Sequence, residues 1–120
     1  MILAMSPTIL LVVYAQLVTK WRVTALADSL GHANGKWERL FVYLADPLIL
    51  STYAAALGGS VAWIFVVERY EVAIAFPVYV GLTVLSIALI GALVLGEQIN
   101  VLRAAGILLI VLGVTIVSRA

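Results

Sequence analysis

The sequence predicts an all-α membrane protein with four transmembrane helices, and three observations predict it. Hydrophobic residues make up 65% of the chain, well above the share of about half found in soluble proteins. Charged residues make up only 11%, too few to cover a soluble core with a polar surface. Nearly all of these charges fall between four long apolar stretches. We therefore expect one membrane domain over residues 1–120.

The four apolar stretches are long enough to cross a bilayer as helices. They cover residues 1–19, 47–67, 72–96 and 101–118, and Arg103 is the only charged residue in them. The hydrocarbon core of a bilayer is about 30 Å thick, which about 20 helical residues cross at about 1.5 Å each. Because an isolated charge is costly in lipid, stretches of this kind indicate membrane spans.

The first span is predicted over residues 7–21. Ser6 can cap this helix, and Pro7 then takes the first helical position, where proline is tolerated. The start of the chain has no basic n-region and no small-residue cleavage site. We therefore expect a retained span rather than a signal peptide.

A long polar connection joins the first span to the second. Residues 31–35, Gly-His-Ala-Asn-Gly, predict a flexible centre. Residues 36–45 mix charges with aromatic side chains, which is typical of a short helix in the headgroup region of a membrane. A simple extension of the second helix explains the same segment, and the sequence leaves both alternatives open.

A helix-start signal and many small residues define the second span, predicted over residues 47–67. Asp46 is the expected N-cap and Pro47 the first helical residue. Alanine, glycine and serine are frequent from Ala54 to Ala62. Small residues of this kind allow close contact between helices in lipid.

The third span is predicted over residues 72–95 and has an irregular centre. Pro77 removes one backbone hydrogen bond, and Gly81 follows four residues later. We therefore expect a kink and a gating point at Pro77 and Gly81.

The fourth span is predicted over residues 101–118, with Asn100 as its N-cap. Gly106 and Gly113 lie seven residues apart and share one face of this helix. Such a face suits close packing, either against a second subunit or within the monomer.

The charges between the spans predict an orientation in the membrane. The first and third connections carry five of the seven Lys and Arg residues, and the opposite side carries Arg69 and Arg119. The positive-inside rule then places both termini outside the cytoplasm. We expect a multi-pass protein of the cytoplasmic (inner) membrane, with Trp21, Trp37 and Trp63 in the interfacial belts.

Composition excludes several functions. The chain has no cysteine, which excludes disulfides and thiolate metal sites. Its one histidine, His32, lies in the glycine-rich loop, where a metal site is not expected. The net charge of +1, without a basic arm, gives no indication of nucleic-acid binding. We expect no metal, no cofactor and no enzymatic activity.

The third and fourth spans resemble a known family. Leu95-Gly96-Glu97 and the run from Gly106 to Val114 resemble the C-terminal signature of the drug/metabolite transporter superfamily, whose four-helix branch is the small multidrug resistance family. In that branch the last helix carries a G-x-x-L-I-x-x-G-V pattern, and this chain matches each specified position. The resemblance implies a homodimer or heterodimer, parallel or antiparallel, that packs through this helix. Ala75 to Gly81 resembles the family's kinked third helix, where aromatic residues line the substrate chamber.

The first span departs from the family. Its multidrug exporters carry a membrane-buried glutamate that binds protons and cationic drugs alternately, and alignment on Lys20 places Val12 at that position. Without an ionisable carboxylate, this antiport has no chemical basis. Val12, Gln16 and Lys20 instead form a stripe spaced four residues apart. Gln16-Leu17-x-x-Lys20 resembles the first helix of the paired subunits that flip aminoarabinose-linked undecaprenyl phosphate.

The second resemblance implies a lipid-linked sugar phosphate as the substrate. Lys20 would pair with the phosphate, and Gln16 would bind hydroxyl groups of the sugar. The alternative for Lys20 is a positive-inside anchor at the end of a helix. The alternative for Gln16 is a hydrogen bond that holds two helices together.

Four further residues complete the candidate substrate site: Asp46, Tyr53, Phe76 and Tyr79. Asp46 can cap its helix, bind substrate or pair with Lys20. The three aromatic side chains can line a cavity, and ordinary packing is the alternative. Glu97 is expected in a solvated turn.

These observations together predict a transporter that flips a polyprenyl phosphate-linked sugar across the membrane by alternating access. Two other functions remain open. One is an accessory membrane subunit of a glycosyltransferase system, which the long first connection suggests. The other is an exporter of small cations or drugs that uses Asp46 or an acidic residue of a partner chain.

Overall fold

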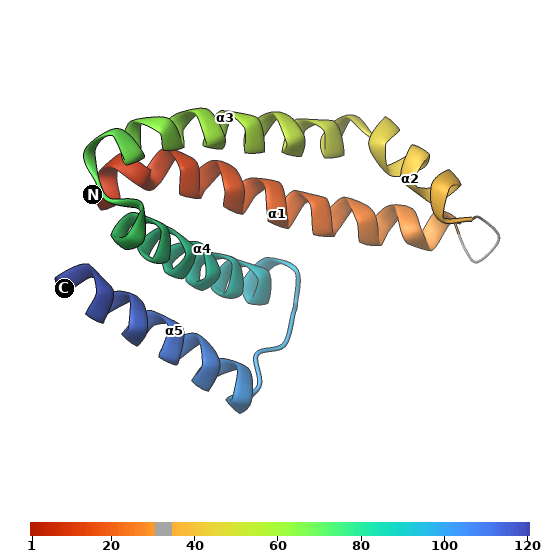
Figure 1. Ribbon diagram of the computed structural model, residues 1–120. Helices are drawn as coiled ribbons and strands as arrows, with labels where there is room; N and C mark the ends of the chain where they lie inside the picture. The colour runs from red at the N-terminus through yellow and green to blue at the C-terminus, as the bar shows by residue number, and fades with distance from the viewer. Residues whose placement is uncertain (31–34) are drawn as a thin grey trace.

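The computed structural model describes residues 1–30 and 35–120, which form five helices (Figure 1). These are α1 (Ile2–Leu30), α2 (Lys36–Ala45), α3 (Pro47–Arg69), α4 (Val72–Val94) and α5 (Val101–Arg119). Four of them, α1, α3, α4 and α5, are long and apolar enough to cross a membrane. The predicted all-α class with four apolar helices is confirmed, and it indicates a multi-pass membrane protein. The predicted flexible centre, with His32, lies outside the described residues except for Gly35.

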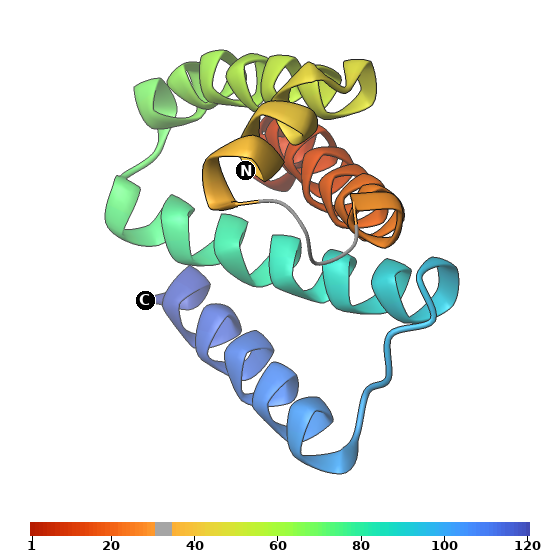
Figure 2. The same ribbon diagram turned by 90° about the vertical axis from the view of Figure 1, so that its right-hand side faces the viewer.

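Helix α1 lies between α3 and α4, and α5 packs on the outer side of α4 (Figures 1 and 2). Helices α3 and α4 join at a short turn and diverge from it, so each contacts α1 more than it contacts the other (Figure 1). The molecule measures 52 × 36 × 22 Å. Its smallest dimension equals about two helix diameters. The chain is therefore a thin slab with α1 at its centre.

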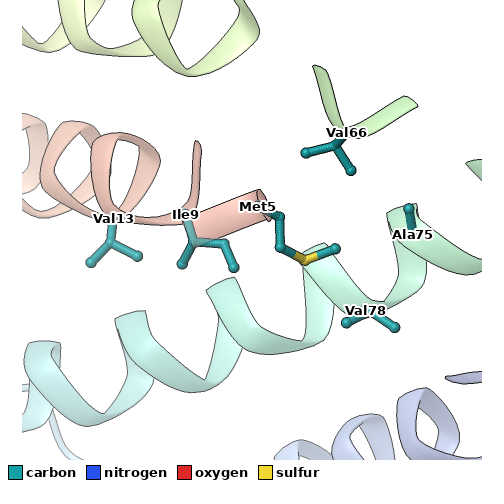
Figure 3. Packing of buried hydrophobic residues seen from close by; sticks show 6 residues of the cluster. All are labelled: Met5, Ile9, Val13, Val66, Ala75 and Val78. Atoms are coloured by element: carbon teal, nitrogen blue, oxygen red, sulfur yellow. The ribbon is translucent and has the colours of Figure 1, made fainter. Parts of the chain in front are cut away.

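The buried core lies where three helices meet, near the turn between α3 and α4 (Figure 3). Met5, Ile9 and Val13 of α1 face Val66 of α3 and two residues of α4, and Met5 and Val66 are fully buried. The two residues of α4 are Ala75 and Val78. The hydrophobic cluster thus joins the first three membrane-crossing helices at one end of the slab.

Helix α1 is longer than predicted, and its predicted start is wrong. It begins at Ile2, and the Ser6 hydroxyl donates a hydrogen bond to the Ile2 carbonyl (2.8 Å) instead of capping the helix. Pro7 lies inside α1, where it removes one N–H early in the helix. The helix continues to Leu30 because no glycine or proline follows Pro7 before Gly31. Its 29 residues reach about 43 Å, which exceeds the thickness of a hydrocarbon core of about 30 Å.

Helix α2 is separate from α3. Asp46 has extended backbone angles (φ −73°, ψ 125°) and ends α2 before Pro47 begins α3. The alternative of a simple extension of the second span is therefore wrong, and the expected short helix at 36–45 is present. Helix α2 runs obliquely to α1 and α3 (Figures 1 and 2). Its place in the headgroup region remains a prediction.

Gly81 allows α5 to approach α4. Helix α4 runs from Val72 to Val94 through both Pro77 and Gly81. A Cβ atom added to Gly81 would lie 3.2 Å from Val114 Cβ and would collide with a methyl group of the same valine. The kink and the gating point predicted at Pro77 and Gly81 remain predictions, and close packing is the contact that Gly81 makes in the chain.

We expect Gly81→Ala to lower the free energy of unfolding by about 1–3 kcal/mol because the added methyl group overpacks the contact with Val114. Thermal unfolding of the purified protein in detergent, followed by circular dichroism, measures the change. The same substitution made together with Val114→Ala should cost much less than it does alone. Gly35→Ala is the control, because no atom lies within 4 Å of a Cβ at that position. Equal midpoints for Gly81→Ala and Gly35→Ala would contradict the packing role.

Candidate functional site

Helices α1 and α3 are held together by close contact and by hydrogen bonds along their length. The Thr8 hydroxyl donates to the Gly59 carbonyl (3.0 Å), and the Thr19 hydroxyl donates to that of Thr52 (3.0 Å). A Cβ atom on Gly59 would lie 3.5 Å from both the Thr8 carbonyl oxygen and Val12 Cγ2. The small residues of α3 therefore allow the close approach that the sequence predicts. This contact fixes which face of α1 remains uncovered.

The uncovered face of α1 forms a groove with α3 and α4. A cavity of about 210 Å³ in it is lined by Thr8, Val12, Gly59, Ser60, Trp63, Phe76 and Tyr79. The ring of Trp63 lies 6.2 Å from that of Phe76 and 5.0 Å from that of Tyr79 (centroid distances). The structure thus brings two predicted site residues, Phe76 and Tyr79, together across from Val12. Trp63, which the sequence assigns to an interfacial belt, belongs to the same aromatic cluster.

A second cavity of about 450 Å³ lies farther along α1. It is lined by Lys20, Trp21, Thr24 and Ala25 of α1, Val94 and Leu95 at the end of α4, and Glu97. Gln16 is exposed and lies four residues from both Val12 and Lys20. Residues at this spacing share one face of a helix. We call the first cavity, lined by Trp63, Phe76 and Tyr79, the aromatic cavity, and the second, lined by Lys20 and Glu97, the charged cavity. The stripe of Val12, Gln16 and Lys20 therefore leads from the aromatic cavity to the charged cavity.

The turn after α4 places Glu97 in the charged cavity. Gly96 has a φ of +69°, a conformation that favours glycine. The Gly91 carbonyl accepts hydrogen bonds from the backbone amides of Leu95 (3.0 Å) and Glu97 (3.3 Å). One Glu97 carboxylate oxygen lies 3.3 Å from where a Cβ of Gly91 would be. Two glycines thus allow this carboxylate to reach the cavity that Lys20 lines.

Glu97 is a candidate site residue that sequence reasoning missed, because its motif was interpreted only as a turn. In the described part of the chain, Lys20 and Glu97 line one cavity but form no ion pair with each other. The signal was present in Leu95-Gly96-Glu97, since a glycine before an acid can turn the carboxylate back over the helix. The charged cavity therefore offers a cation and an anion to a bound molecule.

Asp46 lies outside both cavities and joins three helices. Its carboxylate accepts hydrogen bonds from the amides of Leu48 (2.8 Å) and Ile49 (3.4 Å), which confirms the predicted cap. It also accepts from Arg22 Nε (3.0 Å) and forms an ion pair with Arg22 Nη2 (2.5 Å). The alternative of a pair with Lys20 is therefore wrong.

The choice of Arg22 over Lys20 follows from helix geometry. The two residues lie two positions apart and so point about 200° apart around α1. Arg22 faces α3, whereas Lys20 lines the cavity at the end of α4. Hydrogen bonds from the Arg22 guanidinium hold the pKa of Asp46 below its ordinary value of 3.8, although burial acts in the opposite direction.

Two groups of predicted residues lie away from the groove. Tyr53 is exposed on α3 and lines neither of the two cavities. Gly106 and Gly113 have no atom within 4 Å of an added Cβ. No residue of α5, which the structure describes in full, is buried. The glycine face of α5 is therefore open, as packing against another subunit would require, and that packing remains a prediction.

Comparison of the chain with protein-family models, with curated proteins and with solved structures gave no match. The assignment of the chain as a multi-pass membrane protein therefore rests on its own sequence and structure. It has four helices that can cross a membrane, and a groove whose two ends differ in polarity.

We expect substitutions of Asp46 to destabilise the protein in a fixed order. Asp46→Asn keeps a cap acceptor but loses the ion pair with Arg22, whereas Asp46→Ala loses both. Thermal midpoints in detergent should therefore fall from wild type to Asp46→Asn to Asp46→Ala. Asp28→Ala serves as the control, because Asp28 is exposed near the end of α1. An Asp46→Ala midpoint equal to that of Asp28→Ala would refute the role of this contact.

Stability should also fall on acidification. The pKa of Asp46 is lower in the folded protein than in the unfolded chain, so its stabilising contribution is complete above the unfolded value of about 4. The contribution is lost as the pH falls through the folded pKa. Thermal midpoints recorded from about pH 6 down to about pH 3 should therefore drop more steeply for wild type than for Asp46→Asn. Parallel plots of thermal midpoint against pH for wild type and Asp46→Asn would rule out a contribution of the Asp46 carboxylate to this pH dependence.

Proposed function

We propose that this chain is a transporter of the small multidrug resistance type that flips a polyprenyl phosphate-linked sugar across the cytoplasmic membrane. The observation that carries the proposal is the stripe of Val12, Gln16 and Lys20, with an aromatic cavity at one end and a charged cavity at the other. A substrate with an apolar tail and a charged head matches these two environments.

The charged cavity suits the head of such a substrate. The Lys20 ammonium pairs with the phosphate, since hydrogen bonds between ionised groups are the stronger ones. Gln16, one turn deeper, offers an amide to sugar hydroxyls. An amide in lipid is costly unless it has a polar partner, and a sugar in the groove supplies one. Trp21 and Thr24 complete the wall on the side of α1.

The aromatic cavity suits an apolar chain. Trp63, Phe76 and Tyr79 form a continuous surface of contacting rings, and Val12 completes it from α1. A glutamate at the position of Val12 would suit a cationic drug and a proton, whereas valine adds only apolar surface. This lining favours a lipid over a cation as the transported molecule.

A second subunit completes the proposed transporter. The slab is only 22 Å thick, and its groove is open on one side. The exposed face of α5 with Gly106 and Gly113 supplies a surface for close helix packing. Two such subunits enclose a path between them and expose it to either side of the membrane in turn. The proposed transport moves a lipid across the membrane without making or breaking covalent bonds.

We expect Lys20→Gln to slow flipping of a labelled polyprenyl phosphate-linked sugar in reconstituted vesicles by about 10- to 100-fold, which corresponds to one hydrogen bond with a charged partner. Gln16→Leu should slow it by about 2- to 10-fold, as expected for a neutral hydrogen bond. Arg119→Gln is the matched control, because it removes a cation at the far end of α5. Flipping at the wild-type rate in both Lys20→Gln and Gln16→Leu would contradict substrate binding by these two residues.

A further inference from the structure

Helix α2 presents an apolar stripe away from the rest of the chain. Trp37 and Phe41 are 74% and 77% exposed, and neighbouring leucines at positions 40 and 44 are 42% and 39% exposed. Their spacing of three, four and seven residues puts all four side chains on one face. No residue of α2 is buried, although the structure describes the whole helix. So large an apolar face on so short a helix needs a partner other than water.

The two edges of this stripe differ in charge. At about 100° per residue, Lys36 and Tyr43 lie about 90° and about 110° from the centre of the stripe on one side, and Glu38 lies about 110° from it on the other side. Arg39 lies about 150° from the centre on the side of Lys36. A cavity of about 400 Å³ on the basic edge is lined by Lys36, Trp37, Arg39, Leu40 and Tyr43. Arg39 Nη2 donates a hydrogen bond to the Tyr43 hydroxyl (3.1 Å), which orients the guanidinium along this edge.

Helix α2 ends where a helix that can cross a membrane begins. Asp46 follows α2 directly, and α3, which is long and apolar enough to cross a membrane, begins at Pro47. The Asp46 carboxylate is bound to Arg22, so the end of α2 is tied to α1 beside the start of α3. Helix α2 cannot move far from the start of α3 while this contact holds.

We propose that the basic edge of α2 binds the headgroup of an anionic phospholipid. Lys36 and Arg39 pair with the phosphate, and Trp37 and Leu40 contact the upper part of the acyl chains. A phosphate accepts the paired donors of a guanidinium, and tryptophan suits the boundary between headgroups and chains. The arrangement of cations beside an apolar stripe with tryptophan, phenylalanine and leucine is that of a helix lying on a membrane surface, which favours lipid over protein as the partner. This site is independent of the transported molecule and of Lys20.

The test uses the full chain, reconstituted in vesicles, with Trp21→Phe and Trp63→Phe so that Trp37 is the only tryptophan. Quenching of its fluorescence by brominated phosphatidylglycerol is compared with quenching by brominated phosphatidylcholine. We expect a preference for the anionic lipid, and Lys36→Gln with Arg39→Gln should reduce it by about 5-fold for each charge removed. Arg69→Gln with Arg119→Gln removes the same charge at the C-terminal ends of α3 and α5 and should keep the preference.

Three results would overturn the proposal. One is equal quenching by the two lipids before any charge is removed. Another is a preference that survives in the α2 double variant or disappears in the control. The third is quenching of Trp37 by aqueous acrylamide and by neither lipid, which would direct the stripe to a protein partner instead. Circular dichroism of each variant is the check that it remains helical, so that a lost preference reports on lipid binding.

Discussion

The contact between α1 and α3 is the interaction on which the rest of the structure depends. Lipid gives two helices no hydrophobic reason to associate, so close packing and hydrogen bonds must hold them together. Gly59 allows the backbones to approach, and Thr8 and Thr19 bond across the contact. The Arg22–Asp46 ion pair joins α1 to the start of α3, which Asp46 also caps. With α1 fixed in this way, α4 packs on its other side, and the groove lies between α3 and α4.

The chemistry of the groove is set by the side chains that the packing of α1 with α3 and α4 leaves exposed. Val12 and the aromatic cluster make one end apolar, and Lys20 and Glu97 make the other end charged. A molecule that matches both ends must itself be amphiphilic. The same contact also gives α2 its place, because Asp46 serves at once as the end of α2, the cap of α3 and the partner of Arg22. One carboxylate therefore connects the spans to the proposed lipid-binding helix.

The spans were predictable because the cost of charge in lipid leaves a strong pattern in the sequence, and the caps were predictable because they are local. Asn100 accepts a hydrogen bond from the Arg103 amide (2.8 Å), as its position before an apolar run predicts. The extent of α1 was not predictable from hydropathy, since a helix continues into water until a residue ends it. Arg22, Trp63 and Glu97 were missed as partners because their contacts depend on how separate helices pack.

Site-specific photo-cross-linking tests most directly whether the groove binds an amphiphilic lipid. A photoreactive side chain at Gln16 lies on the stripe between the two cavities, whereas one at Leu10 is exposed about 120° away around α1. With a labelled polyprenyl phosphate in vesicles, labelling from Gln16 should saturate and be displaced by unlabelled lipid. Labelling from Leu10 should rise in proportion to lipid. Labelling that is equally unsaturable at both positions would contradict a binding groove between α3 and α4.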